Sequence, residues 1–232
     1  STLYSHKSRI QHFVEWCDEN GFGSLNELTP PDLHRFKTAR GSEVNKVTLK
    51  TQLDTLRVFL RFCESIDAIH SDMSDKLLSP TLQKNEDARE VMLDEDRSTE
   101  ILEYLRKYEY ASLNHVILLI LWRTGMRIGA LHSLDVEDYD PDNQSLTTKH
   151  RPETDTTLKN QGEGERFISL RQSTCEVLDD YISTHRPACE DEHGREPLIC
   201  SSTDHRLAKS VIRHRIYSIT RPCYSGDSCP HD

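Results

Sequence analysis

The segment Leu121-Trp-Arg-Thr-Gly-Met-Arg-Ile-Gly-Ala-Leu131 places an arginine where two helices are predicted to meet. The apolar stretch 113–122 predicts a buried helix that ends at Gly125, and Arg127 follows where the next helix begins. Packed neighbours on both sides would hold its backbone while the guanidinium reaches a cleft. Such a planar, permanently charged and preorganised group suits a phosphoryl transition state. On spacing alone, an arginine that caps a helix or forms a salt bridge is the commoner explanation.

Lys159 is the second candidate, in a polar stretch before the alternating segment Arg166-Phe-Ile-Ser-Leu170. We expect a β-hairpin here, with Lys159 on its tip. A mobile lysine that is desolvated beside phosphate can protonate a departing alkoxide oxygen. Lys149 lies before the turn and is a weaker rival for this task. A solvated loop lysine without a catalytic role is the alternative.

The segment Thr124-Gly-Met-Arg-Ile-Gly-Ala-Leu131 resembles the first signature box of the tyrosine recombinases, the phage integrase family. Asp135-Val-Glu-Asp-Tyr-Asp140 is similar to the strand entry that follows that box, and the hairpin 158–170 has the family's order of lysine, glycine and arginine. The resemblance covers essentially the whole chain. It implies that Arg127 binds the scissile phosphate and that Lys159 protonates the leaving 5′-oxygen. The composition, the linker and the cysteine-rich tail resemble the haloarchaeal branch, which implies an archaeal virus or mobile element.

The resemblance also implies a reaction. A tyrosine attacks a DNA phosphate and forms a 3′-phosphotyrosyl intermediate, and the phosphate is then religated to a partner strand. The phosphodiester energy is retained, so no cofactor is expected for catalysis. The implied partners are double-stranded DNA and further copies of the intact protein in a synaptic tetramer. Two alternatives remain. One is a non-catalytic DNA-binding regulator or decoy that occupies recombination sites, and the other is a helical interaction protein with a chance Thr-Gly-x-Arg.

The sequence departs from the family's pattern after Arg127. The family has a His-x-x-Arg box and then a nucleophilic tyrosine, but the one His-x-x-Arg of the chain is His6-Lys-Ser-Arg9. Tyr217 and Tyr224 lie in no such context. We therefore expect a catalytic domain truncated before these segments, in a chain that binds DNA but does not cleave it.

The tail Arg221-Pro-Cys-Tyr-Ser-Gly-Asp-Ser-Cys-Pro-His-Asp232 carries three zinc-type ligands, Cys223, Cys229 and His231. Tetrahedral zinc needs four ligands, often on a turn that contains glycine, and Gly226 would supply that turn. The tail therefore predicts a structural zinc. Unrelated surface cysteines are the more common explanation.

The net charge of −10 argues at first against a nucleic-acid partner. The window 35–61, however, holds seven basic residues opposed only by Glu43 and Asp54. A locally basic face on an acidic protein can still meet phosphate. We therefore predict that a basic helix contacts DNA through Lys46, Lys50, Arg57 and Arg61.

Hydrophobic periodicity predicts a mainly α-helical fold with a small β-sheet, in two domains. Residues 1–78 are expected to form a helical core-binding domain, 79–90 a linker, and 91–232 a partial α+β catalytic domain. Within the second domain, helices are expected near 100–108, 113–122, 126–134 and 207–219, and a helix from about 175 ends at Pro187. The apolar run 198–200 predicts a short strand.

Several classes of protein are disfavoured by composition. The longest apolar run has seven residues, Val116–Trp122, which is too short to span a membrane. No secretion signal is visible at the start of the sequence. Cys17, Cys63 and Cys175 sit among apolar residues at helical spacing, so we expect reduced core cysteines in a cytoplasmic protein.

Overall fold

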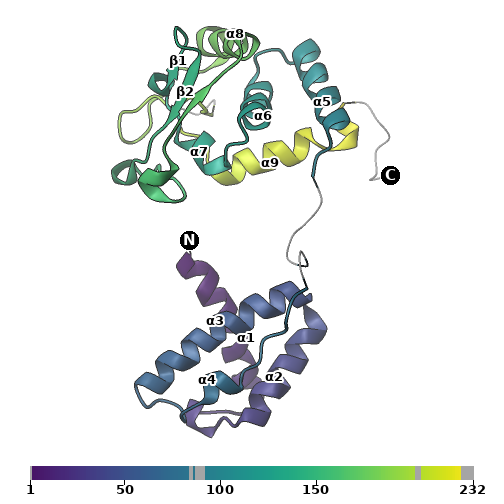
Figure 1. Cartoon of the computed structure of the whole chain (residues 1–232), viewed down its shortest axis with the longest axis vertical. Helices are drawn as coiled ribbons and strands as arrows, with labels where there is room; N and C mark the ends of the chain where they lie inside the picture. The colour runs from purple at the N-terminus through teal and green to yellow at the C-terminus, as the bar shows by residue number, and fades with distance from the viewer. Residues whose placement is uncertain (1, 84–85, 87–91, 202–204, 226–232) are drawn as a thin grey trace. The chain divides into compact units, whose positions relative to one another are not determined.

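The computed structural model describes residues 2–83, 86, 92–201 and 205–225, which form two compact units divided between residues 92 and 93. Each unit has its own hydrophobic core. The predicted fold class, mainly α with a small sheet, is confirmed (Figure 1). No helix among the described residues is long and apolar enough to span a bilayer.

The first unit is helical throughout its described part. Its elements are α1 (Thr2–Glu19), a 3₁₀ turn (Leu25–Glu27), α2 (Pro30–Glu43), α3 (Lys46–Ser65) and α4 (Met73–Lys76). A capping box begins α2, because Thr29 and Asp32 satisfy each other's backbone groups at a start that carries two prolines. The core centres on α3, whose Leu53, Leu56 and Leu60 are at most 1% exposed.

The second unit is built around one buried helix. Its helices are α5 (Glu95–Tyr108), α6 (Leu113–Thr124), α7 (Ile128–Ser133), α8 (Gln172–Asp180) and α9 (Lys209–Ile219). Residues 115–120 of α6 are all buried, since α6 packs against each of the other four helices. This explains why the predicted helix at 113–122 is apolar on every side. Cys175 on α8 is a buried thiol, as predicted, and so are Cys17 and Cys63 in the first unit.

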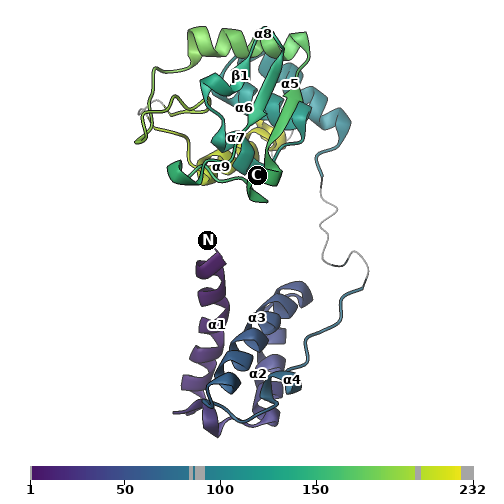
Figure 2. The ribbon, with the colours of Figure 1, turned by 60° about the vertical axis from the view of Figure 1, so that its left-hand side comes forward.

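A three-stranded antiparallel sheet covers the core of the second unit, in the order β1 (Tyr139–Asp140), β2 (Ser145–Thr148) and β3 (Arg166–Ser169) (Figure 2). Leu146 pairs with Ile168 in the register of β2 and β3, and its side chain is fully buried. The predicted hairpin is therefore formed by β2 and β3. The connection between them, residues 149–165, contains two 3₁₀ turns (Pro152–Thr154 and Gln161–Gly164), and Lys159 lies in it rather than on a tight tip.

One local prediction is wrong, and one helix differs from the prediction in the type of its last turn. Residues 198–200 do not form a strand: the isolated bridge Asp135–Pro197 lies just before them, and Cys200 itself forms only an isolated bridge with Arg206. Their side chains are at most 2% exposed, so the apolar run reflects burial in the core rather than strand pairing. The helix expected to end at Pro187 runs as α8 to Asp180 and then as a π-helical turn, Tyr181–His185, so its end is as predicted and only the type of its last turn differs.

Candidate active site

Arg127 is fixed at the junction between α6 and α7. Gly125 adopts a left-handed conformation (φ +61°) that ends α6, and its N–H donates to Leu121 O at 2.9 Å. Arg127 is the N-cap of α7, where its carbonyl accepts from Ala130 N at 2.9 Å. Met126 on one side is buried, while the Arg127 residue is exposed. The backbone is thus held and the guanidinium is left accessible.

Lys159 is held by the residues around it in the β2–β3 connection. Leu158 is 6% exposed and anchors the segment in the core, and its N–H donates to His150 Nδ1 at 3.0 Å. Asn160 and Gln161 follow with positive φ angles, which turns the chain sharply after the lysine. A Cβ added to Gly164 would lie 2.6 Å from Lys159 O, so only glycine allows this close approach.

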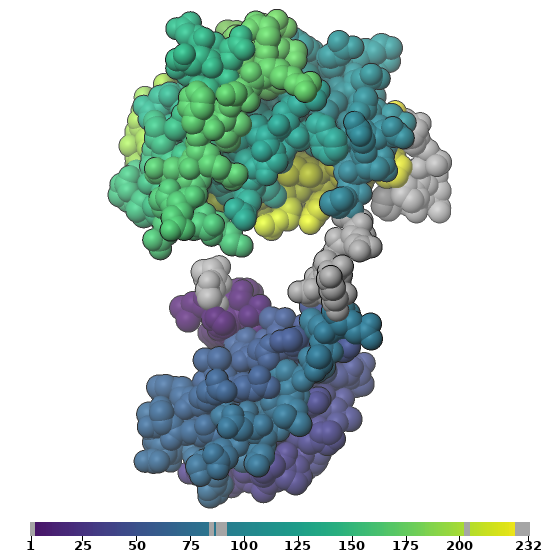
Figure 3. All heavy atoms as spheres, in the orientation of Figure 1, coloured from purple at the N-terminus to yellow at the C-terminus, as the bar shows by residue number. Residues whose placement is uncertain are grey.

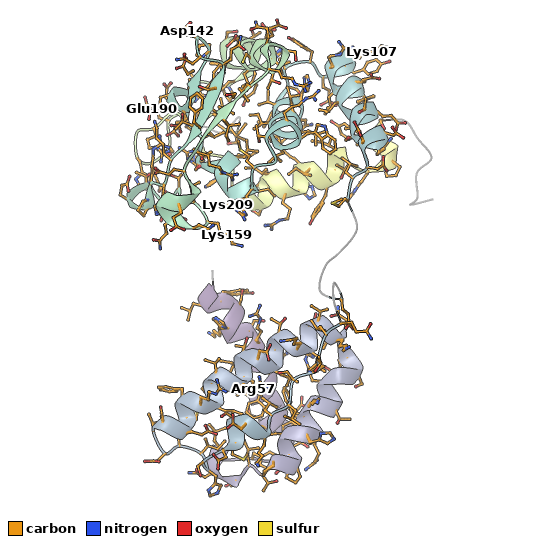
Figure 4. All side chains as sticks on the ribbon, viewed as in Figure 1. Arg57, Lys107, Asp142, Lys159, Glu190 and Lys209 are labelled. Atoms are coloured by element: carbon orange, nitrogen blue, oxygen red, sulfur yellow. The ribbon has the colours of Figure 1, made fainter. Side chains whose placement is uncertain are left out.

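The two residues line one cavity of about 330 Å³. Two further cations complete it, Arg166 at the start of β3 and Lys209 at the start of α9. Figure 4 shows Lys159 and Lys209 together at the same edge of the second unit. No carboxylate is found among the described residues that line the cavity, which are Arg127, Gly129, Ala130, Thr157, Leu158, Lys159, Gly164, Arg166 and Lys209.

These four cationic side chains differ from most others in the second unit because they lack partners. Among the residues that the structure describes, none of the four forms an ion pair or a side-chain hydrogen bond, and none is among those with further interactions. Like charges that face one cavity repel each other unless an anion lies between them. The cavity is therefore suited to a phosphate group.

A buried ionic network supports the base of the connection that carries Lys159. Arg195 donates to Thr154 Oγ1 at 2.5 Å and to Thr156 Oγ1 at 2.8 Å, and its Nε donates to Asp135 at 2.7 Å. Asp135 is 2% exposed and also accepts from Arg206 at 2.5 Å. Because each buried charge is paired, the network fixes the loop relative to α7, which ends just before Asp135.

Asp138 is the second centre of this network, and it forms an ion pair with Lys149, the alternative candidate to Lys159. Arg151 donates to its carboxylate at 2.7 and 2.9 Å, and Lys149 Nζ lies 2.8 Å from it. Burial alone would raise the pKa of Asp138, but the hydrogen bonds from Arg151 and Lys149 outweigh it and hold the pKa below its ordinary value. Lys149 is thus held by carboxylate and does not line the cavity.

The four predicted DNA-binding residues of the first unit share one side of α3. Positions 46, 50, 57 and 61 fall within about 60° of one another on a helix that turns about 100° per residue. Each also has an acidic neighbour that weakens the charge seen from outside: Lys46 pairs with Glu86, Lys50 and Arg57 with Asp54, and Arg61 with Asp75.

Arg57 has the strongest internal contacts of the four. It donates to Leu77 O at 2.6 Å and to Ser79 Oγ at 3.1 Å, which holds the start of the predicted linker against α3. By contrast the Arg61 side chain is 60% exposed and meets Asp75 at only 3.6 Å. The structure thus gives Arg57 a bracing position and leaves Arg61 accessible.

The predicted zinc ligands are described only in part. Cys223 is exposed in a 3₁₀ turn, Pro222–Tyr224, whereas Cys229 and His231 lie outside the described residues. The neighbouring Tyr224 is anchored, since Asn114 Nδ2 donates to its hydroxyl at 3.0 Å and the hydroxyl donates to Glu109 at 2.5 Å.

Sequence reasoning did not single out Lys209 or Arg166 as site residues. Both stood in segments whose secondary structure was expected, Lys209 in the helix near 207–219 and Arg166 in the alternating segment 166–170. The available signal was that each begins its element, where a side chain lies at the edge of the fold. Their meeting with Arg127 depends on the tertiary arrangement.

Comparison of the chain with known proteins identifies its family. The model of the phage integrase family matches residues 91–230, which is more than half of the chain. The chain belongs to the phage integrase family. This confirms the resemblance seen in the first signature box. Members of the family need no cofactor for catalysis.

Among curated relatives, tyrosine recombinase XerC of Lactobacillus delbrueckii subsp. bulgaricus is 20% identical over 174 residues, 75% of this chain and 55% of the relative. Tyrosine recombinase XerD of Proteus mirabilis is 24% identical over the whole chain and 71% of its own length. The chain thus spans about half the length of the first relative.

Solved structures agree on the fold. The Tn1549 transposon integrase (residues 82–397), in complex with circular intermediate DNA, has a TM-score of 0.70 at 16% identity and covers the whole chain and 76% of its own. A lambda integrase (75–356) dimer bound to a COC′ core site has a TM-score of 0.69 at 16% identity, over 98% of this chain and 75% of its own.

Proposed function

We propose that the intact protein breaks and rejoins DNA at specific sites, and that the cavity between α7, α9 and the β2–β3 connection holds the scissile phosphate. The observation that carries this proposal is the meeting of Arg127 and Lys159, 32 positions apart in sequence, in one cavity whose described lining residues include no carboxylate. Family membership supports the reaction class.

In the proposed reaction a tyrosine oxygen attacks phosphorus, a 3′-phosphotyrosyl ester forms, and the bond to the 5′-oxygen breaks. Arg127 would bind the non-bridging oxygens, where negative charge grows in the transition state. Lys159 would give its proton to the leaving 5′-oxygen. A 5′-hydroxyl from the partner strand then reverses these steps, so the number of phosphodiester bonds is conserved and no cofactor takes part.

The described lining of the cavity contains no tyrosine. Tyr217 is exposed and Tyr224 is hydrogen-bonded to Glu109, and neither lines the cavity. Burial is the main cause that raises the pKa of Tyr224 to about 12, and the hydrogen bond to Glu109 is the second. Both disfavour the phenolate. We therefore propose that this chain alone binds duplex DNA without cleaving it.

DNA binding is proposed to involve α3 as well as the cavity. The side of α3 with Lys46, Lys50, Arg57 and Arg61 supports phosphate contacts. The ion pairs of Lys46, Lys50 and Arg61 are partly exposed, and such pairs are worth little and are readily exchanged for phosphate, whereas Arg57 also braces the segment after α4. Self-association on DNA, a cytoplasmic location and an archaeal viral or mobile-element source belong to the same proposal.

Because no tyrosine lines the described part of the cavity, a second candidate function is a regulator or decoy that occupies recombination sites. The two functions differ in covalent chemistry. A version of the protein that includes the tyrosine segment of its gene is incubated with DNA bearing the recombination site, and the covalent protein–DNA complex is quantified on a denaturing gel.

We expect a covalent complex that Arg127→Ala abolishes and Lys159→Ala slows strongly. Lys149→Ala is the matched control, because it removes a lysine from the same connection that does not line the cavity. Binding without any covalent complex would support the regulator instead. Equal loss in the Lys149 variant would contradict the assignment of Lys159.

A further inference from the structure

Arg166 is placed in the cavity by the sheet. It is the first residue of β3, and its backbone N–H donates to Thr148 Oγ1 on β2 at 3.0 Å. The residue is exposed, and its guanidinium has no partner among the described residues. Its position is thus fixed by strand pairing while its charge stays available to a ligand.

Lys209 reaches the cavity from a different direction. It is the first residue of α9, which packs against α6 and α7, and Ile212 on the next turn is fully buried. His132 on α7 lies with its Nδ1 3.0 Å from Leu207 O, and since a carbonyl only accepts, Nδ1 carries the proton. This bond ties the start of α9 to α7, and therefore Lys209 to the helix that Arg127 caps.

The charge of Lys209 affects the protonation of His132, which lies close to the start of α9. Burial lowers the pKa of His132, and the charge of Lys209 lowers it further, against the Leu207 hydrogen bond. The imidazole of His132 is therefore neutral near pH 7. It holds the start of α9 through the Leu207 hydrogen bond and adds no positive charge beside Lys209. Figure 3 shows α9, in yellow, open to solvent at the edge of the second unit.

The charge of the cavity exceeds what one phosphate requires. Its four lining cations carry a formal charge of +4, whereas one phosphodiester carries −1. Arg127 and Lys159 suffice for the proposed chemistry. Successive phosphates of one DNA strand are separated by a rise of only about 3.4 Å. Charge beside the scissile phosphate therefore meets the next phosphate of that strand.

We propose that Arg166 and Lys209 form a second phosphate subsite in this cavity, which binds the phosphate next to the scissile one on the same strand. The subsite rests on the proposed function and refines it. Two phosphates held at once fix the direction of the strand, so the 5′-oxygen faces Lys159 and not the opposite side. Arg166 and Lys209 are thus positioning residues for the scissile phosphate.

The test uses two small ligands and this chain. Thymidine 3′,5′-bisphosphate presents two phosphates with the spacing of one nucleotide, and thymidine 5′-monophosphate presents one. Dissociation constants are measured by NMR from the signals of ¹³C-methylated lysines, which report on Lys159 and Lys209 directly. We expect the bisphosphate to bind at least about tenfold more tightly, since one added charge-assisted contact has that effect.

Lys209→Ala and Arg166→Ala should each reduce this preference severalfold, because each variant should lose more affinity for the bisphosphate than for the monophosphate. Lys209→Arg should restore it. Lys107→Ala is the matched control, because it removes one positive charge at a part of the second unit far from Lys159 in Figure 4. Amide spectra establish that each variant is folded.

The two proposals fail in different ways. If Arg127→Ala weakens the monophosphate but the preference for the bisphosphate survives in both Lys209→Ala and Arg166→Ala, the second subsite is wrong and the proposed function stands. If Lys107→Ala reduces the preference as much as Lys209→Ala, general charge explains it, and the subsite is again wrong. If neither ligand shifts the Lys159 or Lys209 signals, both proposals are wrong.

Discussion

Gly164→Ala should move Lys159 without touching its side chain. A Cβ at position 164 would lie 2.6 Å from Lys159 O and 3.2 Å from Leu158 Cβ, whereas ordinary contact begins at 3.4 Å. The nearest atom belongs to the backbone, so no side-chain rotation relieves the overlap. The connection must shift by about 0.8 Å, the difference between 3.4 and 2.6 Å. Overpacking of this kind costs about 1–3 kcal/mol of folding free energy.

The catalytic effect follows from the same shift. Because misplacement of a catalytic group by about 1 Å costs up to 100-fold in rate, we expect Gly164→Ala to slow covalent complex formation by about 10–100-fold. The rate is measured in the covalent-complex assay proposed above. Urea unfolding gives the change in stability. DNA with a 5′-bridging sulfur, whose leaving group needs no proton, should restore most of the rate.

Gly162→Ala provides the control in the same turn. Nothing lies within 4 Å of a Cβ at that position, so the substitution should be neutral or stabilise by about 0.4–1 kcal/mol through the unfolded chain. Equal rates and stabilities for the two alanine variants would refute the reasoning. A slow Gly164 variant that the sulfur substrate does not rescue would show that Lys159 is not the group displaced.

Three further predictions follow from the buried charges and from α3. Asp138→Asn should abolish a pH-dependent part of the stability. The pKa of Asp138 is lowered in the folded state, so its contribution to stability is full above about pH 4 and is lost as the pH falls further. Thermal unfolding from pH 2 to 7 measures this contribution. Asp135→Ala should destabilise by about 3 kcal/mol in urea, at the low end for a broken buried pair because Arg206 keeps Asp191, and a change below about 1 kcal/mol would contradict this. Arg57→Ala should lower the free energy of unfolding by about 1–2 kcal/mol, because the hydrogen bonds to the segment after α4 are lost. Arg61→Ala should leave stability unchanged and reduce the log–log slope of DNA affinity against salt by about 0.9. Fluorescence anisotropy and urea unfolding measure the two effects, and the reverse pattern would refute these roles.

Local patterns of the sequence were enough to predict most of the helices. The apolar run before Gly125 predicts α6 and its end, and a glycine that ends a helix leaves the next residues to begin another, which places Arg127 at a junction. In α3, Leu49, Leu53, Leu56 and Leu60 recur at helical spacing, and all four are buried. These features depend on periodicity and end residues, which a short window contains.

Other features depend on contacts between distant segments. Residues 198–200 are apolar because they fill the core beside Asp135, and no window of sequence distinguishes this from a strand. Lys209 joins the cavity because His132 holds Leu207, 75 positions away. Likewise, the basic stripe of α3 is offset by Asp75 and Glu86 from outside its own helix. Local charge counts could not include these partners.

The most direct test of the central claim compares two substrates that differ in one atom. With ordinary DNA, both Arg127→Ala and Lys159→Ala should form covalent complex far more slowly than the unaltered protein. With the 5′-bridging sulfur, Lys159→Ala should recover most of its rate and Arg127→Ala should not, because only the lysine supplies the proton while the arginine stabilises charge on the phosphate. Recovery of both variants, or of neither, would contradict the roles proposed for the two residues.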